Sequence, residues 1–348
     1  MASAPFPDER DRRVLLPPVM PEDLEIPDGP RLRLSGAIFA TGWRVDVVRE
    51  AGGADDALWL EALRVRIADV LETIDAQMSP WRDGSDLMRF NRAGDGAVVV
   101  LPEPIRSVVS HALDVAALTD GAFDPALHDA VSLWGFSATA VADGLPDPAR
   151  LAALGRARAD WRQLRFEGDA LVARDGLGLD LCAIAKGYAV DAVMDAVRAT
   201  PGAAAALVEI GGELKGWGIR PDGMPWWVEV EQPGGQGATP IMAALCDWAV
   251  ATSGDYRRSF SHEGLDYCHA IDPRTLSPVR TGVASVAVFD RQCWRADALA
   301  TAMMVMGCDE ALALAEANAI PCIIAVRDGE GIAEHLSSAM REWIDDDD

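Results

Sequence analysis

From about residue 176 onward, the chain is a succession of short apolar segments bounded by glycines or polar turn residues. These segments read GLGLDL, AALVEIGG, GWGIR, PWWVEVEQ, DWAVATSG, YCHAID and GVASVAVFD, and several alternate between apolar and polar residues. Such alternation indicates strands with one buried face, and consecutive strands with no helices between them favour antiparallel pairing. This half of the chain therefore predicts a mainly antiparallel sheet.

Helices are predicted on either side of this pattern and within it. Apolar residues at steps of three and four predict helices over residues 60–78 and 105–116. Two further helices interrupt the strands, at 185–198 and 296–306, and a β-hairpin is predicted over 164–172. The fold class is therefore α+β, with a mainly antiparallel sheet core flanked by helices.

Composition places the chain among globular proteins and argues against one class of partner. Of its 348 residues, 50% are hydrophobic and 25% are charged. The chain has 31 Lys and Arg residues and 55 Asp and Glu residues, which gives a net charge of −24. This balance argues against a nucleic-acid binder that neutralises phosphates with a basic patch. Residues 1–30 are predicted to be a flexible acidic and Pro-rich arm, and residues 31–344 a single catalytic domain.

No segment of the chain is predicted to enter a membrane. A span needs about 18 to 20 apolar residues in a row, and the sequence has no such run. The first 30 residues show no apolar run that leads to a cleavage site or a lipid-acceptor Cys, so we expect a cytoplasmic protein without a membrane anchor. The six cysteines form no C-x-x-C pair and are expected to be reduced.

The segment GLGLDLCAIAKGYAVDAV is the first that indicates chemistry. Lys186 falls near the start of a predicted helix, and the chain has only one other lysine, Lys215. Free N–H groups and the positive end of the helix dipole favour an anion there, and a Lys adds a point charge. Asp180 could accept a hydrogen bond from a base or a sugar. An N-cap Asp followed by a solvated Lys explains the pattern equally well.

A second segment, WRADALAT, indicates a cation site. Asp297 and Thr301 are four residues apart, so on a helix both oxygens project from one face. Mg²⁺ prefers oxygen ligands and is usually completed by substrate phosphates and water. The alternative is an Asp that complements the helix dipole, with the Thr facing a neighbour.

Other candidates are a histidine and two aromatic residues. His269 follows a hydroxyl-rich turn and precedes an Asp-Pro turn, so it could act as a general base or orient a substrate phosphate. A packed, hydrogen-bonded His is the alternative. Trp81 and Phe123 stand beside predicted turns and could stack on an aromatic ring, or could belong to the core. The chain has no G-x-x-x-x-G-K-[ST], G-x-S-x-G, H-E-x-x-H or G-x-G-x-x-G motif.

Seven ordered segments together resemble the FAD:protein FMN transferases, the ApbE-type flavin transferases. They are MSPWRDGSDLMRFN, GAFDPAL with LWGF, LDLCAIAKGYAVD, LVEIGGELKGWG, ATSGDY, HAIDPRT and ADALATAMMVMG, and the resemblance extends from about residue 36 to 326. It implies an ApbE-like, T-fold-like catalytic unit. It also implies Mg²⁺-dependent transfer of FMN from FAD to a Thr or Ser hydroxyl of an acceptor protein, with a phosphodiester formed and AMP released.

The resemblance also assigns roles by position. It makes His269 the base for the acceptor hydroxyl and Asp297 a catalytic residue. The metal ligands would be Asp297, Thr301 and the backbone carbonyl of Ala183, with Mg²⁺ or Mn²⁺ as the ion. The residues implied to bind FAD are Phe39, Trp81, Ala122, Phe123, Asp124, Asp180, Lys186 and His269.

Three positions depart from the family pattern. Phe39 stands where Met is usual, Leu276 where Gly usually follows Asp-Pro-Arg-Thr, and Glu209 where Asn is common. None of them removes a proposed metal ligand or the histidine.

The acceptor is expected to carry a Ser/Thr-Gly-Ala-Thr site. Gln236 precedes Gly237-Ala238-Thr239 in this chain, so the match is incomplete and self-modification is not predicted. Two other functions are compatible with the same residues. One is an FAD pyrophosphatase that releases FMN and AMP, and the other is a non-catalytic FAD-binding protein.

Overall fold

The computed structural model describes residues 12–19, 24–52, 55–137, 145–233, 239–329 and 331–344. Its centre is an eight-stranded sheet in which all neighbouring strands pair antiparallel. From one edge to the other, the order is β18 (Gly331–Leu336), β17 (Cys322–Asp328), β16 (Val283–Asp290), β11 (Ala249–Gly254), β8 (Glu213–Trp217), β7 (Ala203–Ile210), β3 (Thr41–Arg49) and β2 (Arg31–Ile38).

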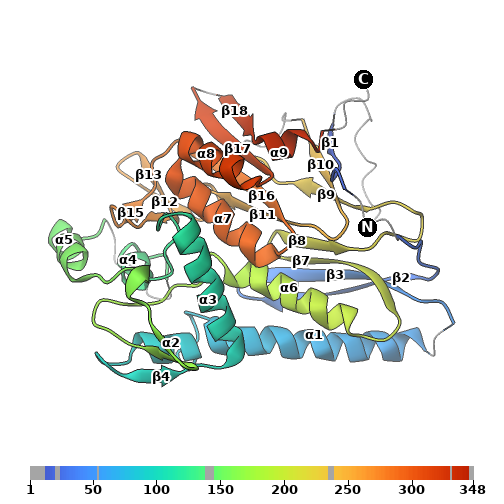
Figure 1. The fold of residues 1–348 in the computed structure, drawn as a ribbon, viewed down its shortest axis with the longest axis horizontal. Coiled ribbons are helices and arrows are strands. Elements are labelled where there is room, and N and C mark those ends of the chain that lie inside the picture. Colours follow the sequence, from blue (N-terminus) through green and yellow to red (C-terminus); the bar gives the residue numbers. More distant parts are fainter. Residues whose placement is uncertain are drawn as a thin grey trace.

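Four helices cover one face of this sheet (Figure 1): α1 (Asp56–Met78), α3 (Glu103–Leu118), α6 (Ala185–Arg198) and α7 (Cys293–Met306). The buried residues of α1 recur at steps of three and four, from Leu63 to Met78, which is the apolar stripe expected of a helix on a core. In contrast, α7 is buried on nearly all sides, and the carboxylate of Asp297 is buried with it.

A three-stranded sheet lies against the opposite face (Figure 1). It consists of β1 (Arg13–Leu15), β10 (Ile241–Leu245) and β9 (Trp226–Val230). Together with α9 (Ser338–Arg341), it encloses a second apolar core that includes Trp343 and Phe289. The sheet is therefore covered on both faces, which explains why β16 is buried along almost its whole length.

Smaller elements lie beyond the C-terminal ends of α1 and α7 (Figure 1). They are α2 (Asp86–Asn91), α4 (His128–Leu133), α5 (Pro148–Ala157), α8 (Cys308–Asn318), β4 (Val98–Val100), β5 (Phe166–Glu167), β6 (Ala170–Val172), β12 (Ser259–His262), β13 (Leu265–Cys268), β14 (Ile271–Asp272) and β15 (Ser277–Pro278). Residues of α4, of β13 and of the segments that follow them form a third apolar cluster, which contains Phe136, Tyr267 and Leu276.

Most elements predicted from the sequence are confirmed. The predicted helices correspond to α1, α3, α6 and α7, and the predicted hairpin to β5 and β6. The fold class is α+β with a mainly antiparallel sheet, as expected. The two N-terminal strands β2 and β3 and the C-terminal strands β17 and β18 were not predicted.

The strand predicted at GLGLDL is wrong. Leu177, Leu179 and Leu181 are buried as expected, but the segment pairs with no strand of the described chain. Its backbone forms hydrogen bonds with the side chain of Asn91 and with the backbone of Pro125 instead of with a neighbouring strand. The side-chain amide of Asn91 accepts from the Leu179 N–H at 2.7 Å and donates to its carbonyl at 2.8 Å, and the Asp180 N–H donates to the carbonyl of Pro125 at 2.8 Å.

Part of the predicted N-terminal arm is docked on the body. Arg13–Leu15 pairs parallel with β10, and the side chain of Leu15 is fully buried. Arg13 also forms an ion pair with Glu334 at 2.5 Å. These residues are therefore not a free arm, whereas residues 1–11 and 20–23 lie outside the described chain.

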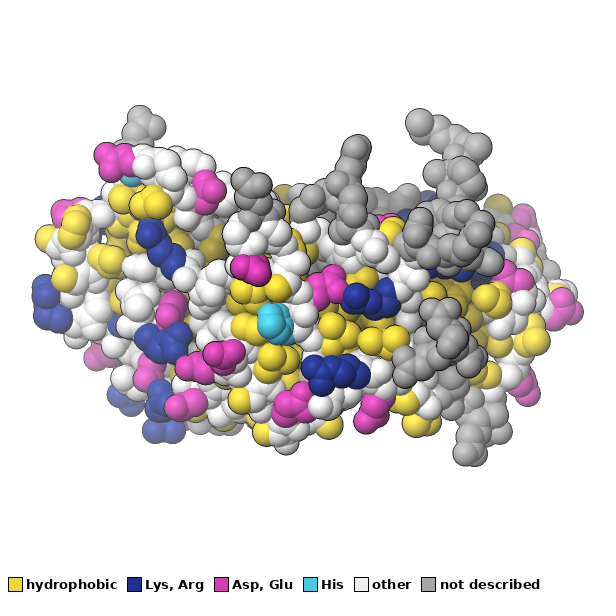
Figure 2. All heavy atoms as spheres, turned by 90° about the horizontal axis from the view of Figure 1, so that it is seen from above, with side chains coloured by type: hydrophobic (Ala, Val, Ile, Leu, Met, Phe, Trp, Pro, Cys, Tyr) yellow, Lys and Arg dark blue, Asp and Glu magenta, His cyan; other side chains and the backbone are white. Residues whose placement is uncertain are grey.

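The surface is charged but mixed. Figure 2 shows Asp and Glu side chains beside Lys and Arg side chains on the face seen from above, with apolar side chains between them. Among the described residues, no helix is both long and apolar enough to cross a membrane. The excess negative charge is thus not gathered into a single patch on this face.

The contact between α6 and α7 at Gly187 generates a stability prediction. A Cβ at Gly187 would lie 2.4 Å from the carbonyl oxygen of Cys293, so Gly187→Ala must push the two helices apart. We expect a loss of about 1–3 kcal/mol in the free energy of unfolding, measured by urea denaturation. Gly84→Ala is the control, because a Cβ there meets nothing within 4 Å. Equal stability of the two variants would contradict the prediction.

Candidate active site

One cavity collects residues from several distant parts of the chain. It lies where α7, the start of α6 and β11 meet the turn at 122–124 and the segment around His269. Its lining residues are Ala122, Phe123, Asp124, Leu127, Val131, Phe136, Asp180, Cys182, Ala183, Lys186, Glu213, Thr252, Ser253, Gly254, Arg257, Arg258, His269, Ala270, Ile271, Asp297, Thr301, Met304 and Val305. One part of this lining is apolar, and the other carries carboxylates, cations and hydroxyls.

Asp297 is the one carboxylate of α7 and is buried, with 4% of its surface exposed. Its Oδ2 accepts a hydrogen bond from the backbone N–H of Gly187 at 2.9 Å. Burial raises the pKa of Asp297 to about 7, and the nearby charge of Glu213 acts in the same direction, whereas Lys186 opposes it. A cation beside this carboxylate would favour its ionised form.

The predicted metal ligands border the same cavity. Thr301 lies on α7 four residues after Asp297, and its Oγ1 is 3.0 Å from the Oγ of Ser253 on β11. Ala183 lines the cavity just before α6 begins. The described residues contain no group of three His, Cys, Asp or Glu side chains placed to hold a metal ion. The candidate set is therefore one carboxylate, one hydroxyl and one carbonyl, all oxygen donors suited to a hard cation.

Lys186 is half-buried in the first turn of α6, as predicted, and its ammonium is ion-paired with Glu213. Burial acts to lower the pKa of Lys186, but the carboxylates of Glu213 and Asp297 outweigh it and raise the pKa. Glu213 itself has only 1% of its surface exposed, and its Oε2 has no hydrogen-bond partner among the described residues. Lys186 therefore stays charged at the cavity wall.

The other lysine has a structural role. Lys215 on β8 is buried and forms an ion pair with Asp191 of α6 at 2.5 Å. The second oxygen of Asp191 accepts the backbone N–H of Trp294 at 2.9 Å, in the first turn of α7. This buried group therefore ties β8 and α6 to the start of the helix that carries Asp297.

His269 lies between β13 and β14 at the cavity wall. The backbone carbonyl of Arg258 accepts its backbone N–H at 3.0 Å and lies 3.2 Å from its Nδ1. A proton on Nδ1 satisfies this contact and leaves the lone pair of Nε2 free. Burial lowers the pKa of His269 below its usual 6.5, so the imidazole is neutral at pH 7 and can accept a proton.

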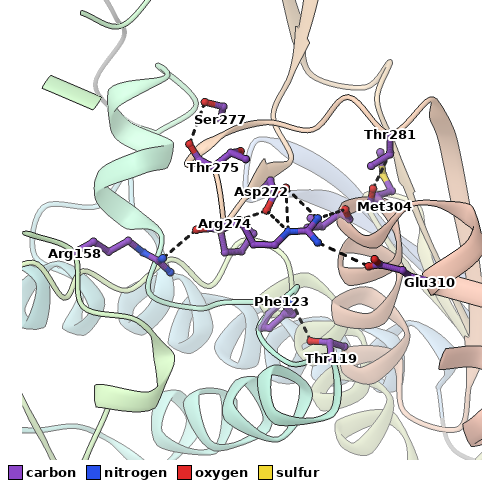
Figure 3. Close-up of polar contacts among 12 residues, drawn as sticks. Thr119, Phe123, Arg158, Asp272, Arg274, Thr275, Ser277, Thr281, Met304 and Glu310 are labelled. Carbon is purple, nitrogen blue, oxygen red and sulfur yellow. Dashed lines mark hydrogen bonds and ion pairs between the residues drawn. The ribbon is translucent and has the colours of Figure 1, made fainter. Parts of the chain in front are cut away.

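The turn that carries Phe123 and Asp124 is closed by local hydrogen bonds. The Oγ1 of Thr119 accepts the Phe123 N–H at 3.1 Å (Figure 3). Asp124 accepts the Ala126 N–H at 2.8 Å and is ion-paired with Arg158. Burial raises the pKa of Asp124, although Arg158 opposes the shift. Both carboxylate oxygens of Asp124 thus have protein partners, and Asp124 borders the cavity as part of a fixed turn.

The Asp-Pro-Arg turn after His269 is anchored to the end of α7 (Figure 3). Arg274 donates to both oxygens of Asp272 and to the carbonyl of Val305 at 3.2 Å. From the other side, Arg158 donates to the carbonyl of Pro273 at 3.1 Å. The turn therefore joins three walls of the cavity, namely the Asp124 turn, the His269 segment and α7.

Two predicted residues do not line the cavity. Phe39 lies in the hairpin turn between β2 and β3, with φ 52°, and packs against the main core. Trp81 is 49% exposed, but its ring lies 5.6 Å from the guanidinium carbon of Arg258, which does line the cavity. Trp81 is therefore at the edge of the site.

Asp180 lines the cavity but does not cap α6. Its Oδ1 accepts the N–H of Cys182 at 2.8 Å, and the first residues of α6 receive no side-chain cap.

Leu276, one of the departures from the family pattern, has φ 55°, in the left-handed region that favours glycine. The Nε1 of Trp134 donates to its carbonyl at 2.7 Å, which helps to hold this conformation.

Several cavity residues were not singled out by the sequence analysis, among them Glu213, Arg257 and Arg258. Glu213 directly follows the Gly211-Gly212 pair, and the two arginines directly follow the Thr-Ser-Gly-Asp-Tyr turn. The signal available was their position, since Glu213 lies within the LVEIGGELKGWG segment and the two arginines follow ATSGDY.

The buried Asp124–Arg158 pair generates a second prediction. Arg158→Met leaves a buried carboxylate without its partner, so we expect the free energy of unfolding to fall by about 3–5 kcal/mol. Urea denaturation at pH 7 measures this loss. The double variant Asp124→Asn with Arg158→Met should recover part of it, and a single variant as stable as the wild type would disprove the argument.

Comparisons with known proteins show a similarity over most of the chain. Residues 39–324 match the model of the ApbE family. The chain is 37% identical over 317 residues to a FAD:protein FMN transferase of Vibrio cholerae, covering 90% of this chain and 93% of that protein. It is 34% identical over 296 residues to a FAD:protein FMN transferase of Treponema pallidum, covering 80% and 79% of the two chains.

A solved structure is similar along nearly the whole body. The apo form of the flavinyl transferase ApbE from Pseudomonas stutzeri superposes with a TM-score of 0.83 at 35% sequence identity. The match covers 90% of this chain and 97% of that structure.

Proposed function

Because the chain belongs to the ApbE family, we propose that it is a FAD:protein FMN transferase that moves FMN from FAD to a Thr or Ser hydroxyl and releases AMP. The similarity to FAD:protein FMN transferases supports the flavin transfer. The metal dependence and the hydroxyl acceptor are implied by the resemblance to the family, and the oxygen donors of the cavity are compatible with the metal.

The observation that carries this proposal is the division of one cavity into two chemical halves. Its apolar part, with Phe123, Val131, Phe136 and Ile271, is suited to a flat ring system. Its polar part holds Lys186 and two arginines, which are suited to a pyrophosphate. A dinucleotide such as FAD combines both kinds of surface.

The metal site would be formed by Asp297, Thr301 and the carbonyl of Ala183. These oxygen donors fit Mg²⁺, and Mn²⁺ has the same preference. When bound, such an ion neutralises charge on the phosphoryl oxygens. Asp297 is held for this role by the Gly187 N–H, which leaves its Oδ1 without a partner among the described residues.

The protein's own groups then supply binding and proton transfer. Lys186, fixed by Glu213, offers its ammonium to the pyrophosphate, and Trp81, Asp180 and the 122–124 turn border the remaining ligand. His269 takes the proton of the acceptor hydroxyl on Nε2 as that oxygen bonds to the phosphorus of FMN. The bond from this phosphorus to the AMP oxygen breaks, and AMP leaves with the electron pair.

The acceptor is proposed to present a Ser/Thr-Gly-Ala-Thr site to this cavity. Water in place of the hydroxyl would make the same site an FAD pyrophosphatase, and a chain that binds FAD without cleaving it would lack both activities. The cytoplasmic location stays a prediction. Of the internal Gly237-Ala238-Thr239 segment, Gly237 and Ala238 lie outside the described residues.

A transfer assay tests the proposal. Purified protein is incubated with FAD, Mg²⁺ and an acceptor that carries the proposed site. Chromatography should show AMP release, and mass spectrometry should show that the acceptor gains the mass of one FMN for each AMP released. Asp297→Asn should lower the rate about 100-fold or more, because it removes the charged oxygen donor. Asp309→Asn, which changes an exposed carboxylate in the first turn of α8, is the matched control and should keep full activity.

The outcomes of this assay distinguish the transferase from the hydrolase and from a non-catalytic FAD-binding protein. AMP and free FMN without an acceptor gain would make the protein a hydrolase. FAD that remains intact with Mg²⁺ and acceptor would leave a binding protein and refute the transferase.

The pH dependence of transfer tests His269 as the base. Because the base must be neutral and burial lowers its pKa, kcat/KM should fall on the acid side with a midpoint below 6.5 and level off above it. At saturating Mg²⁺, His269→Gln should lower kcat about 100-fold or more and abolish this acid limb. An acid limb that survives unchanged in His269→Gln would assign it to another group.

A further inference from the structure

The cations of the cavity differ in whether a carboxylate neutralises them. Lys186 is paired with Glu213, and Arg257 with Glu231. Arg258 lines the same cavity, yet its guanidinium has no ion pair or hydrogen bond within the described chain. In a protein with a net charge of −24, an arginine without a carboxylate partner beside a cavity is an unused positive charge.

The packing of Arg258 keeps its donors available. Its guanidinium lies over the ring of Trp81, with the guanidinium carbon 5.6 Å from the ring centroid. A cation–π contact of this kind uses the charge of the guanidinium but none of its hydrogen-bond donors, so the N–H groups can bind two oxygens of one phosphoryl group. Trp81 thus supports the planar cation and consumes none of its hydrogen bonds.

The backbone of Arg258 connects this cation to the base. Its carbonyl accepts the backbone N–H of His269 at 3.0 Å and faces the imidazole Nδ1 at 3.2 Å. The residue that orients the imidazole therefore also carries the unpaired guanidinium. Because one residue holds both, the cation and the base can act on the two partners of one step: the cation on the phosphoryl group, and the base on the hydroxyl that attacks it.

We propose that Arg258 is a further catalytic residue, whose guanidinium binds the nonbridging oxygens of the phosphoryl group during its transfer, with Trp81 as the supporting surface. This inference rests on the proposed transferase function. In the step, the acceptor oxygen bonds to phosphorus, the bond to AMP breaks, and the hydroxyl proton goes to His269. Arg258 exchanges no proton and stabilises the charge that develops on the phosphoryl oxygens.

Lys186 and Arg257 differ from Arg258 in that a carboxylate already neutralises the charge of each. The Lys186 ammonium is fixed by a carboxylate with 1% of its surface exposed. Arg257 is held by both oxygens of Glu231 and by the carbonyl of Gly211 at 2.8 Å. Arg258 can reorient toward a phosphoryl group while the ion pairs of the cavity remain intact.

The experiment compares Arg258→Met, Arg258→Lys and Arg280→Met in the full-length protein with FAD, Mg²⁺ and acceptor. Arg280 is the matched control, because it also lies over an aromatic ring, 5.1 Å from Tyr267, but does not line the cavity. AMP release gives kcat and KM, and flavin fluorescence gives FAD affinity. Thermal denaturation verifies that each variant is folded.

We expect Arg258→Met to lower kcat about 10²- to 10³-fold with less than about threefold change in KM for FAD. Arg258→Lys should recover part of this rate, because it restores the charge without the two-pronged geometry. Added guanidinium ion should raise the rate of Arg258→Met and leave Arg280→Met unchanged, a rescue that a purely structural role for the side chain does not produce.

Other results overturn the inference. A normal kcat in Arg258→Met with a raised KM would show that the side chain binds the ground state and the transition state equally and does not accelerate the transfer. An equal loss in Arg280→Met, or a loss that guanidinium does not rescue, would assign the effect to packing. If wild-type protein itself transfers no FMN, the proposed function fails and the inference with it, whereas an active wild type beside an equally active Arg258→Met refutes the inference alone.

Discussion

The close contact between α6 and α7 at Gly187 determines the geometry of the candidate site. Because Gly187 has no Cβ, the backbone at Cys293 can approach it, and its N–H can reach the buried carboxylate of Asp297 at 2.9 Å. One turn later, Asp191 receives the Trp294 N–H and the ammonium of Lys215. These contacts hold the two helices in one register, and Lys186, next to Gly187, is thereby placed on the same cavity as Asp297.

Charge in this cavity is arranged in compensated pairs. Asp124 is neutralised by Arg158, Lys186 by Glu213, and Arg257 by Glu231. Buried ions need such partners, because the loss of solvation otherwise exceeds what the fold can provide. Asp297 and Arg258 are among the cavity groups that have no ion-pair partner in the described chain, and they are free to respond to a cation and to a phosphoryl group. The neutral His269 adds a proton acceptor that does not disturb this balance.

Local patterns predicted the helices because their apolar spacing is a property of consecutive residues, and the same reasoning correctly placed Asp297 and Thr301 on one helix face. The prediction failed where nonlocal contacts decide. The GLGLDL segment resembles a strand, but the side chain of Asn91 takes its backbone hydrogen bonds. Phe39 stands where the family usually has Met, in a hairpin turn where it packs against the core and does not line the cavity, and its role toward FAD stays a prediction.

The sequence by itself determined the secondary structure of most segments, the α+β class, the family and the kinds of chemical groups available, since these depend on residue type and on spacing along the chain. Only the tertiary structure decided which groups meet. Glu213 and Lys186 are 27 residues apart, and Trp81 and Arg258 belong to distant segments, so no local pattern could pair them. Burial, which raises the pKa of Asp297 and lowers that of His269, is likewise a property of the packed whole, because desolvation depends on every element that surrounds a group.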